Sequence, residues 1–401
     1  EPQSYTGVSS LSPIKIETDI LYVEAKGYTV RLLSYNDLSK LYAGSDISIL
    51  AAHLFGQDKE ILSWTFAQEP FKIVHAIRAD GQRLLGTIIK DQNLFAWTPS
   101  STQGYYKQAV TVREERQDKV YLDVERYING KVVAYIEEEA PRDFGKIEDA
   151  WAVDSGLSIE PSFPNATLVI ETASGSDVLV IATSPVFSIN DVNGVIFIKE
   201  AKLRITSYIS PTQVRVNILR PITDLFPETD NTRDYVAGEW EYYPPTTILT
   251  GMNHLEGQTV KVLADGNVIN GLVVSGGYVT LPYTVNKITA GLGYRCVART
   301  LPLTARGNVI EDKRMRVVGL GTRVHESRGL KTGRSLSKLY DMKERRNEVY
   351  GEPIAPLSDM TFLKIDPSWE PGGQTYYVVE DPLPVTILGH VNSVDIGDDP
   401  E

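Results

Sequence analysis

Tight-turn dipeptides that separate runs of alternating apolar and polar residues constrain the fold of this chain more than any other feature. Asp80-Gly81, Asn129-Gly130 and Asp265-Gly266 each lie between two such runs. Both central residues of a type I′ hairpin turn need positive φ, which Asn-Gly and Asp-Gly adopt readily. The three dipeptides therefore predict antiparallel hairpins. We therefore also interpret the glycines between His254 and Val285 as turn residues and not as parts of a phosphate-binding loop.

The residues around these turns have the periodicity and composition of strands. Val120, Leu122 and Val124 face one side of a predicted strand, and the polar residues between them face the other. Tyr, Thr, Val and Ile are frequent, and these side chains favour strands. The predicted fold class is all-β and mainly antiparallel. It comprises several domains, with a propeller-like β-domain, small inserted β-barrel modules and few short helices.

Two segments have helical patterns instead. In residues 45–57, Ser45 or Asp46 is a suitable N-cap and Gly56 a suitable end. The predicted apolar stripe of this helix contains Ile49, Leu50, His53 and Leu54. We interpret His53 on this stripe as a core residue and not as a metal ligand. Residues 335–349 form a second, weaker pattern.

The length of 401 residues indicates several domains. Residues 1–150 are predicted to be the first part of a propeller-like antiparallel β-domain, and residues 151–235 a small β-barrel-like module. Residues 236–310 are predicted to be a small β-module with an Asp-Gly hairpin. Residues 311–401 are predicted to be strands that complete the main domain.

Motifs for catalysis and cofactor binding are incomplete throughout the sequence. The stretches 291–296 (GLGYRC) and 319–324 (GLGTRV) lack the third glycine of a dinucleotide fingerprint and the helix that follows it. The stretch 329–335 (GLKTGRS) is one residue short of a phosphate loop and has Arg334 where lysine is needed. His325-Glu326-Ser327 is not followed by the second histidine of a zinc protease. We therefore predict no catalytic, cofactor-binding or metal-binding residues and no enzyme activity.

Charge and cysteine content narrow the function classes further. The net charge of −12 disfavours a protein that binds nucleic acid over its whole surface. The single cysteine, Cys296, permits no intrachain disulfide, and we interpret it as a small core residue. The acidic stretch from Glu137 to Asp143 is interpreted as a solvated strand end, not as an acid/base pair.

One segment is basic in an otherwise acidic chain. From Glu311 to Arg346, eleven Lys or Arg residues occur with five acidic residues. We interpret this segment as a solvated face or as salt-bridge partners of acidic neighbours. Phosphate contact and a charge-complementary subunit interface are the alternatives.

Several longer stretches follow one another in a recognisable order. They include "SPIKIETDILYVEAKGYTVRLLSYND", "DISILAAHLFG", "WTFAQEPFKIVHAIRADGQRLLGTIIKDQNLFAWTP", "VYLDVERYINGKVVAYIEE", "FSINDVNGVIFI", "ITSYISPTQVRVNIL", "HLEGQTVKVLADGNV" and "VEDPLPVTILGHVNSVDIGD". The ordered set resembles the tail nozzle family, or tail tubular protein B family, of short-tailed bacteriophages and related prophages. The resemblance covers nearly the whole chain.

The resemblance implies a structural virion protein of the phage tail, without catalytic residues or cofactor. Subunits of that family form a six-fold ring below the tail adaptor and contact tail fibre proteins. The ring encloses the channel through which double-stranded DNA leaves, without sequence-specific binding. An acidic chain suits such a conduit because like charge keeps phosphates from adhering. Family members usually carry a segment ahead of where this chain begins, so the resemblance leaves the completeness of the adaptor-contacting part open.

Two other functions remain as alternatives. A β-rich adhesin or fibre-attachment protein that binds host surface glycans would expose aromatic clusters, and residues 238–247 (GEWEYYPPTT) are the candidate. We prefer to place Trp240 of this stretch in the core of the third module. A tail-associated hydrolase would need two carboxylates roughly 5–10 Å apart in a sugar-sized groove. Fold class alone does not separate these functions.

Overall fold

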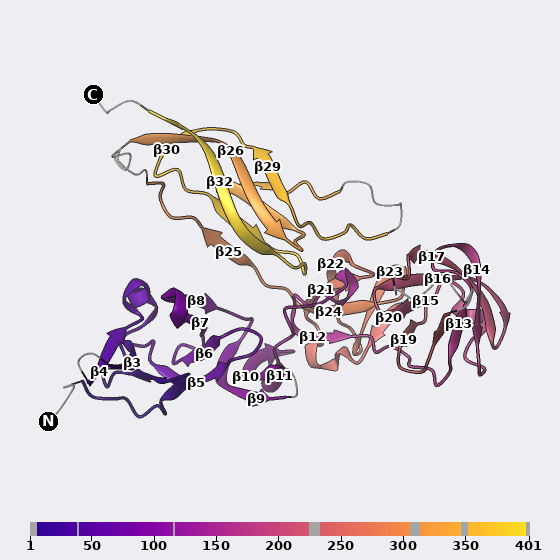
Figure 1. Cartoon of the computed structure of the whole chain (residues 1–401), viewed down its shortest axis with the longest axis horizontal. Coiled ribbons are helices and arrows are strands. Elements are labelled where there is room, and N and C mark those ends of the chain that lie inside the picture. The colour runs from indigo at the N-terminus through magenta and orange to yellow at the C-terminus, as the bar shows by residue number, and fades with distance from the viewer. Residues whose placement is uncertain are drawn as a thin grey trace. The chain divides into compact units, whose positions relative to one another are not determined.

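The computed structural model describes residues 6–37, 40–114, 117–223, 233–304, 313–345 and 352–397 (Figure 1). The elements in these residues are strands in antiparallel sheets and a few short 3₁₀ helices. The predicted all-β, mainly antiparallel fold is confirmed. No helix in the described ranges is long and apolar enough to cross a membrane. The chain forms two compact units, unit 1 (Glu1–Ala140) and unit 2 (Pro141–Glu401).

Unit 1 is a series of up-and-down antiparallel sheets, the strand order found in propeller blades. The first sheet contains β1 (Ile14–Ile16), β2 (Asp19–Val23), β3 (Val30–Asn36) and β4 (Leu41–Asp46). The second contains β5 (Ile61–Ala67), β6 (Ile73–Arg78), β7 (Arg83–Ile89) and β8 (Leu94–Ser100). The third has the order β11 (Lys131–Glu138), β10 (Asp118–Ile128) and β9 (Tyr105–Arg113).

Two tryptophans connect the first two sheets of unit 1. The indole Nε1 of Trp64 in β5 donates to the carbonyl of Ser12 at 2.7 Å. The indole Nε1 of Trp97 in β8 donates to the carbonyl of Ile47 at 3.1 Å. Apolar side chains of both sheets form one core around them. The two indole rings pack in this core, and their N–H groups bond to the segments next to the first sheet. Both effects hold the first sheet against the second.

The helix predicted at residues 45–57 is wrong in type and in orientation. A 3₁₀ helix, η1 (Ile49–Leu54), forms instead, and its buried residues are Ala51 and Leu54. A 3₁₀ helix has three residues per turn, so residues i and i+3 share a face. The predicted stripe assumed the wider α-helical period. His53 and Leu50 are consequently exposed, and His53 is not a core residue.

The second predicted helix, at residues 335–349, is also wrong. Residues 338–341 are strand β28 (Lys338–Asp341), which pairs with β27 (Leu330–Ser335) as a hairpin. Residues 346–349 of this prediction lie outside the described residues. The remaining 3₁₀ helices are η2 (Lys90–Gln92), η3 (Ile147–Asp149), η4 (Ile189–Asp191) and η5 (Met252–Leu255).

The largest sheet of unit 2 has seven strands and curls into a nearly closed barrel. In spatial order it contains β18 (Arg233–Tyr235), β13 (Leu168–Ile170), β14 (Gly175–Ala182), β17 (Gln213–Arg220), β16 (Ala201–Ser210), β15 (Val195–Ile198) and β19 (Trp240–Tyr243). Its interior is a single apolar cluster that includes Trp240 and Leu203. We call this sheet the barrel sheet.

Smaller sheets make up the rest of unit 2 (Figure 1). One contains β12 (Asp154–Ser158), β24 (Ile288–Leu292), β21 (Thr259–Ala264) and β22 (Asn267–Val273), and another β20 (Thr246–Thr250) and β23 (Tyr278–Val285). A third contains β25 (Cys296–Arg299), β31 (Tyr376–Val379), β27 and β28. In the last, β26 (Arg314–His325) pairs with β29 (Met360–Lys364), β30 (Trp369–Pro371) and β32 (Thr386–Ile396).

All three dipeptides that predicted hairpins lie between paired antiparallel strands. Asn129-Gly130 and Asp265-Gly266 have positive φ at both residues, as a type I′ turn requires. At Asp80-Gly81 only the glycine has positive φ, so that turn is of another type. The side chain of Asp80 is held by Arg78, with Arg78 Nε donating to Asp80 Oδ1 at 3.0 Å. This contact stabilises a longer, four-residue connection between β6 and β7.

Candidate functional site

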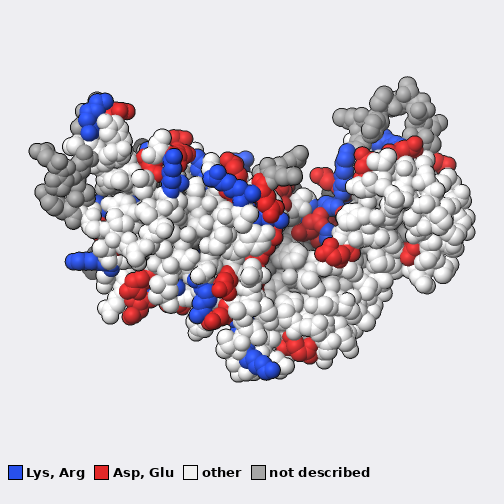
Figure 2. Space-filling view, turned by 90° about the horizontal axis from the view of Figure 1, so that it is seen from below, with Lys and Arg blue, Asp and Glu red and all other residues white. Residues whose placement is uncertain are grey.

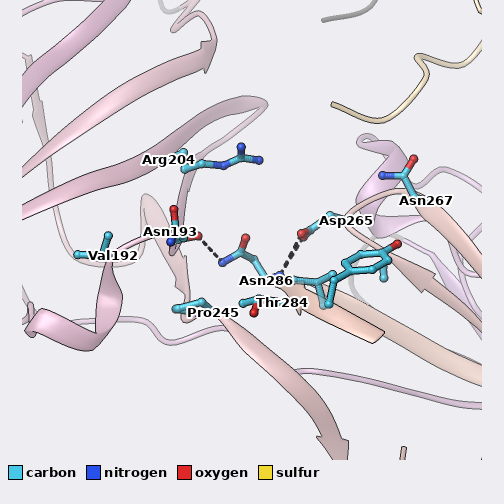
Figure 3. Close-up of a pocket in the computed structure, with 11 residues that line it drawn as sticks. Val192, Asn193, Arg204, Pro245, Asp265, Asn267, Thr284 and Asn286 are labelled. Carbon is cyan, nitrogen blue, oxygen red and sulfur yellow. Dashed lines mark hydrogen bonds between the residues drawn. The ribbon is translucent and has the colours of Figure 1, made fainter. Parts of the chain in front are cut away.

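A pocket of about 560 Å³ opens in unit 2 between the barrel sheet and the hairpins of β21 to β24 (Figure 3). We call it the Asn286 pocket. The barrel side contributes Val192, Asn193, Arg204 and Pro245, and the hairpin side contributes Ala264, Asp265, Asn267, Tyr283, Thr284, Val285 and Asn286. Most of these side chains are polar, and its volume lies within the usual range for small-molecule sites.

The turn between β21 and β22 holds the wall of the pocket in place. Asp265 Oδ1 accepts the backbone N–H of Lys287 at 2.8 Å, and its Oδ2 accepts that of Asn286 at 3.0 Å. Burial raises the pKa of the Asp265 carboxyl, against the lowering effect of these backbone donors. The positive φ that the turn needs at Asp265 thus also aims its carboxylate at the β23–β24 loop.

The side chain of Asn286 is fixed by contacts on its amide side. Its Nδ2 donates to the carbonyl of Asn193 at 3.0 Å and to the carbonyl of Tyr243 at 3.3 Å. Only 5% of Asn286 is exposed. With both amide hydrogens used, the carboxamide oxygen points into the pocket, toward the space below Arg204 (Figure 3). Among the described residues this oxygen has no hydrogen-bond partner.

Arg204 closes the opposite side of the Asn286 pocket and belongs to a chain of ion pairs. Its Nη2 donates to Glu352 Oε1 at 3.2 Å, and Glu352 also pairs with Lys202 at 2.9 Å. Lys202 in turn lies 3.3 Å from Glu148, which accepts from Arg220 at 2.8 Å. These pairs hold Arg204 in one orientation, and among the described residues its other N–H groups have no further partner.

One carboxylate is found among the described residues that line the Asn286 pocket. Glycoside hydrolysis requires two carboxylates on either side of the scissile bond. Asp265 is the only carboxylate among the described residues that line the pocket, and its two oxygens already accept backbone N–H groups. The arrangement can bind a ligand but provides no acid/base pair. Within the described ranges, no three His, Cys, Asp or Glu residues group as metal ligands.

The glycine-rich stretches that resembled nucleotide motifs are parts of strands and their connections. Gly291 and Leu292 end β24, residues 319–324 lie within β26, and residues 330–335 form β27. None of these strands leads into a helix, as a phosphate-binding loop requires. His325 ends β26 in an exposed position, with its Nδ1 3.4 Å from the hydroxyl of Ser358.

Cys296 is not the small core residue that we predicted. It lies in β25, whose four residues are all exposed. Among the described strands, β25 pairs with β31 alone and is thus an edge strand. Desolvation and the nearby Asp154 raise the pKa of the Cys296 thiol. A reactive cysteine needs a lowered pKa, so this environment does not activate the thiol as a nucleophile.

The acidic stretch from Glu137 to Asp143 is a strand end, but it is less solvated than we predicted. Both Glu137 oxygens accept from Arg126, at 2.8 and 2.7 Å, and Arg126 is only 1% exposed. Glu139 pairs with Arg83 at 3.2 Å. These carboxylates are structural partners of buried arginines, which explains why the stretch is acidic.

The basic segment from Glu311 to Arg346 pairs extensively with acidic residues of unit 2. The pairs are Arg316–Asp395, Arg328–Glu344, Lys331–Glu380, Arg334–Glu370 and Lys338–Asp366. This pairing supports the salt-bridge interpretation over phosphate contact. Residues 311, 312 and 346 of the segment lie outside the described residues.

Trp240 is a core residue, as preferred in the sequence interpretation, but its core is that of the barrel sheet. It is buried in the barrel cluster, and its Nε1 donates to the carbonyl of Ala166 at 3.0 Å. The aromatic stretch 238–247 therefore does not expose this ring for glycan stacking. Sequence reasoning missed Asn286 and Arg204, because single polar residues in strands and loops carry no motif spacing.

Lys287, next to the pocket, is a buried lysine with charged and aromatic neighbours. Its Nζ pairs with Asp149 and lies 5.0 Å from the ring centre of Tyr243. Burial, together with the charge of Lys146, lowers the pKa of Lys287 to about 8, although Glu148 acts in the opposite direction.

This pKa leads to a prediction for Lys287→Met. An unfolded lysine keeps its proton up to about pH 10.4, so unfolding takes up a proton between pH 8 and that value. The stability of the wild type relative to Lys287→Met should therefore rise over this interval, by up to roughly 3 kcal/mol. Urea unfolding of both proteins at pH 7.5 and 10.5 measures the difference. A stability difference that stays constant between the two pH values would contradict the lowered pKa.

Comparisons with known proteins identify no family. No family model matches the chain, and no curated protein matches it. One similar solved structure is the Bombyx mori GH32 β-fructofuranosidase BmSUC1, at 10% identity and a TM-score of 0.21, covering 71% of this chain and 66% of that chain. Another is the Bacteroides ovatus xyloglucan PUL GH43B, at 10% identity and a TM-score of 0.20, covering 98% of this chain and 91% of that chain. Such slight likeness has no bearing on activity.

Proposed function

We propose that this chain is a structural subunit of a bacteriophage tail nozzle, which assembles into a ring and forms a conduit for DNA ejection. The observation that carries the assembly part of the proposal is an exposed apolar sheet face in unit 2. The phage assignment itself rests on the sequence resemblance.

The exposed face is formed by three neighbouring strands, β29, β26 and β32. Phe362, Gly321 and Val391 lie directly opposite one another across these strands, on the side away from the core. Phe362 is 73% and Val391 59% exposed. A Cβ at Gly321 would come within 2.7 Å of Met360 Cε and 2.9 Å of Phe362 Cε1, so glycine at this position leaves room for both side chains of β29. We call Phe362, Gly321 and Val391 the Phe362 face.

The edge strand β32 adds backbone groups to the same surface. It has eleven residues, most of them exposed, and in the described part of the chain it pairs only with β26. Long apolar edge strands are sites of association between chains. An exposed apolar face that continues to an open edge is therefore suited to a subunit interface.

The distribution of charge is compatible with a conduit that does not hold DNA. On the face shown in Figure 2, Lys and Arg lie among Asp and Glu in small groups, separated by areas without charged side chains. No extended basic area is visible on that face among the described residues. Phosphate binding to a surface needs concentrated positive charge. The net charge of −12 also disfavours binding of DNA phosphates.

The Phe362 face can be tested with the double variant Phe362→Ser/Val391→Ser. Both side chains are exposed in the subunit, so the fold should be retained while apolar contact area between subunits is lost. We expect self-association to weaken by at least 10-fold, since burying one such side chain contributes about 1.5–3 kcal/mol. Sedimentation velocity over a concentration series measures this change.

A matched control removes two exposed apolar side chains elsewhere in unit 2. Phe163→Ser/Ile189→Ser changes residues of comparable exposure at the barrel sheet. Its self-association should equal that of the wild type. Equal association of the wild type and Phe362→Ser/Val391→Ser would show that the Phe362 face is not a subunit interface.

A further inference from the structure

The Asn286 pocket has no role in the proposed assembly, yet its polar groups are arranged as in a binding site. We propose that it binds a saccharide, with ligand hydroxyl groups seated between the Asn286 carboxamide oxygen and the Arg204 guanidinium. This inference goes beyond the structural function and does not depend on it.

The first argument is the unsatisfied acceptor in a buried residue. Asn286 is 95% buried, and both hydrogens of its amide are used by the carbonyls of Asn193 and Tyr243. The oxygen cannot exchange places with the nitrogen without losing these two bonds. The oxygen itself is not among the buried polar atoms that lack a partner, so it is open to the pocket. A ligand hydroxyl group can donate to it there in place of water.

The second argument is the donor on the opposite side of the space. Arg204 Nη2 donates to Glu352, and among the described residues no other contact of its guanidinium N–H groups is found. A ligand group between Arg204 and Asn286 must accept from the first and donate to the second. Hydroxyl groups do both. A sugar presents several hydroxyls at fixed spacing, and thus fits a pocket with a donor and an acceptor facing one another.

The third argument excludes the simplest anion. A phosphate would accept from Arg204 but would bring negative charge into the pocket. It would also lie near the carboxylate of Asp265, which lines the same pocket. Like charges at close range disfavour binding, and the pocket contains one basic residue against one acidic residue. A neutral, hydroxyl-rich ligand avoids this repulsion.

The last element is an aromatic ring at the rim. Tyr283 in β23 lines the pocket and is about half exposed. Aromatic side chains provide large contact area at low entropic cost, and the apolar face of a sugar ring can lie against them. The volume of about 560 Å³ accommodates a mono- or disaccharide unit.

The test uses saturation-transfer NMR on the full chain with glucose, galactose, N-acetylglucosamine and glucuronic acid, each at about 10 mM. A monosaccharide has few atoms, so we expect a Kd on the order of 1 mM for at least one sugar. Arg204→Gln and Tyr283→Ala should each reduce the saturation signal of that sugar by at least about 5-fold. Inorganic phosphate at the same concentration should not displace it.

Tyr278→Ala is the matched control, because Tyr278 is an exposed tyrosine of the same strand that does not line the pocket. It should bind like the wild type. The inference is overturned if none of the four sugars gives a signal. It is equally overturned if the signal persists in both Arg204→Gln and Tyr283→Ala, or if phosphate displaces the sugar. Unchanged circular dichroism of the variants excludes loss of fold as the cause of lost binding.

Discussion

Glu148→Ala should lower the free energy of unfolding of unit 2 by about 3–5 kcal/mol, because it leaves buried positive charge without its partner. Glu148 lies in η3, its side chain is completely buried, and it pairs with Lys202 and Arg220 from two strands of the barrel sheet. Lys202 is also buried, and among the described residues it would keep Glu352 as its one acidic partner. Hydrogen exchange of the β16 and β17 amides measures the loss in unit 2 separately from unit 1.

Two comparisons make this prediction specific. Asp177→Ala removes an exposed pair with Arg215 on the same sheet, and exposed pairs contribute about 0–1 kcal/mol. Glu148→Gln keeps the shape but not the charge. A loss for Glu148→Ala no larger than for Asp177→Ala would contradict the proposed role of the buried ion pairs.

The Glu148 pairs also have a definite pH dependence. Burial raises the pKa of Glu148, but Lys202 and Arg220 outweigh burial and hold the pKa below its usual value. A carboxyl with a lowered folded pKa stabilises the protein above its unfolded pKa, about 4.3. The stability advantage of the wild type over Glu148→Gln should be complete above about pH 5 and shrink as the pH falls.

Arg126→Met should have an effect of similar size on unit 1, about 3–5 kcal/mol. The guanidinium makes a two-bond contact with Glu137 and donates from Nη1 to the hydroxyl of Thr102 and the carbonyl of Gln103, both at 2.8 Å. Methionine fills much of the volume but leaves three acceptors without this donor. Hydrogen exchange of the β10 and β11 amides measures the loss.

The control for Arg126→Met lies on the same sheet. Lys107 pairs with Glu125 at 2.8 Å, but both side chains are substantially exposed. Lys107→Met should change stability by less than about 1 kcal/mol. The double variant Arg126→Met/Glu137→Leu should recover part of the loss, since replacing a whole buried pair by apolar residues is often neutral. If the double variant were less stable than Arg126→Met, the cost would not come from the stranded carboxylate.

Local rules were sufficient to predict the fold class, because hairpin turns and strand alternation are encoded over a few residues. Asn129-Gly130 and Asp265-Gly266 need positive φ whatever surrounds them. The prediction of an α-helix at residues 45–57 was wrong because a short row of apolar residues cannot distinguish a period of 3.6 residues from the period of 3.0 residues in η1. The prediction that Cys296 is a core residue was wrong for another reason. Its exposure depends on β25 being an edge strand, and no local sequence pattern encodes which strands pair.

The candidate site could not be predicted from the sequence, because it depends on contacts between distant residues. Asn286 belongs to none of the sequence motifs considered above. The orientation of its side chain is set by the backbone carbonyls of Asn193 and Tyr243. Arg204 acquires its position through Glu352, which is distant in the chain. The Phe362 face likewise depends on the pairing of β26 with strands that follow it much later. Only strand register reveals that Phe362, Gly321 and Val391 lie in one row.

The measurement that tests the central claim most directly is the mass of the purified assembly, by native mass spectrometry, together with negative-stain images. The proposed nozzle role predicts a closed ring of about six subunits with a central opening wide enough for duplex DNA, as heterologous interfaces that close would produce. A stable trimer without such an opening would contradict the nozzle and favour a fibre or adhesin.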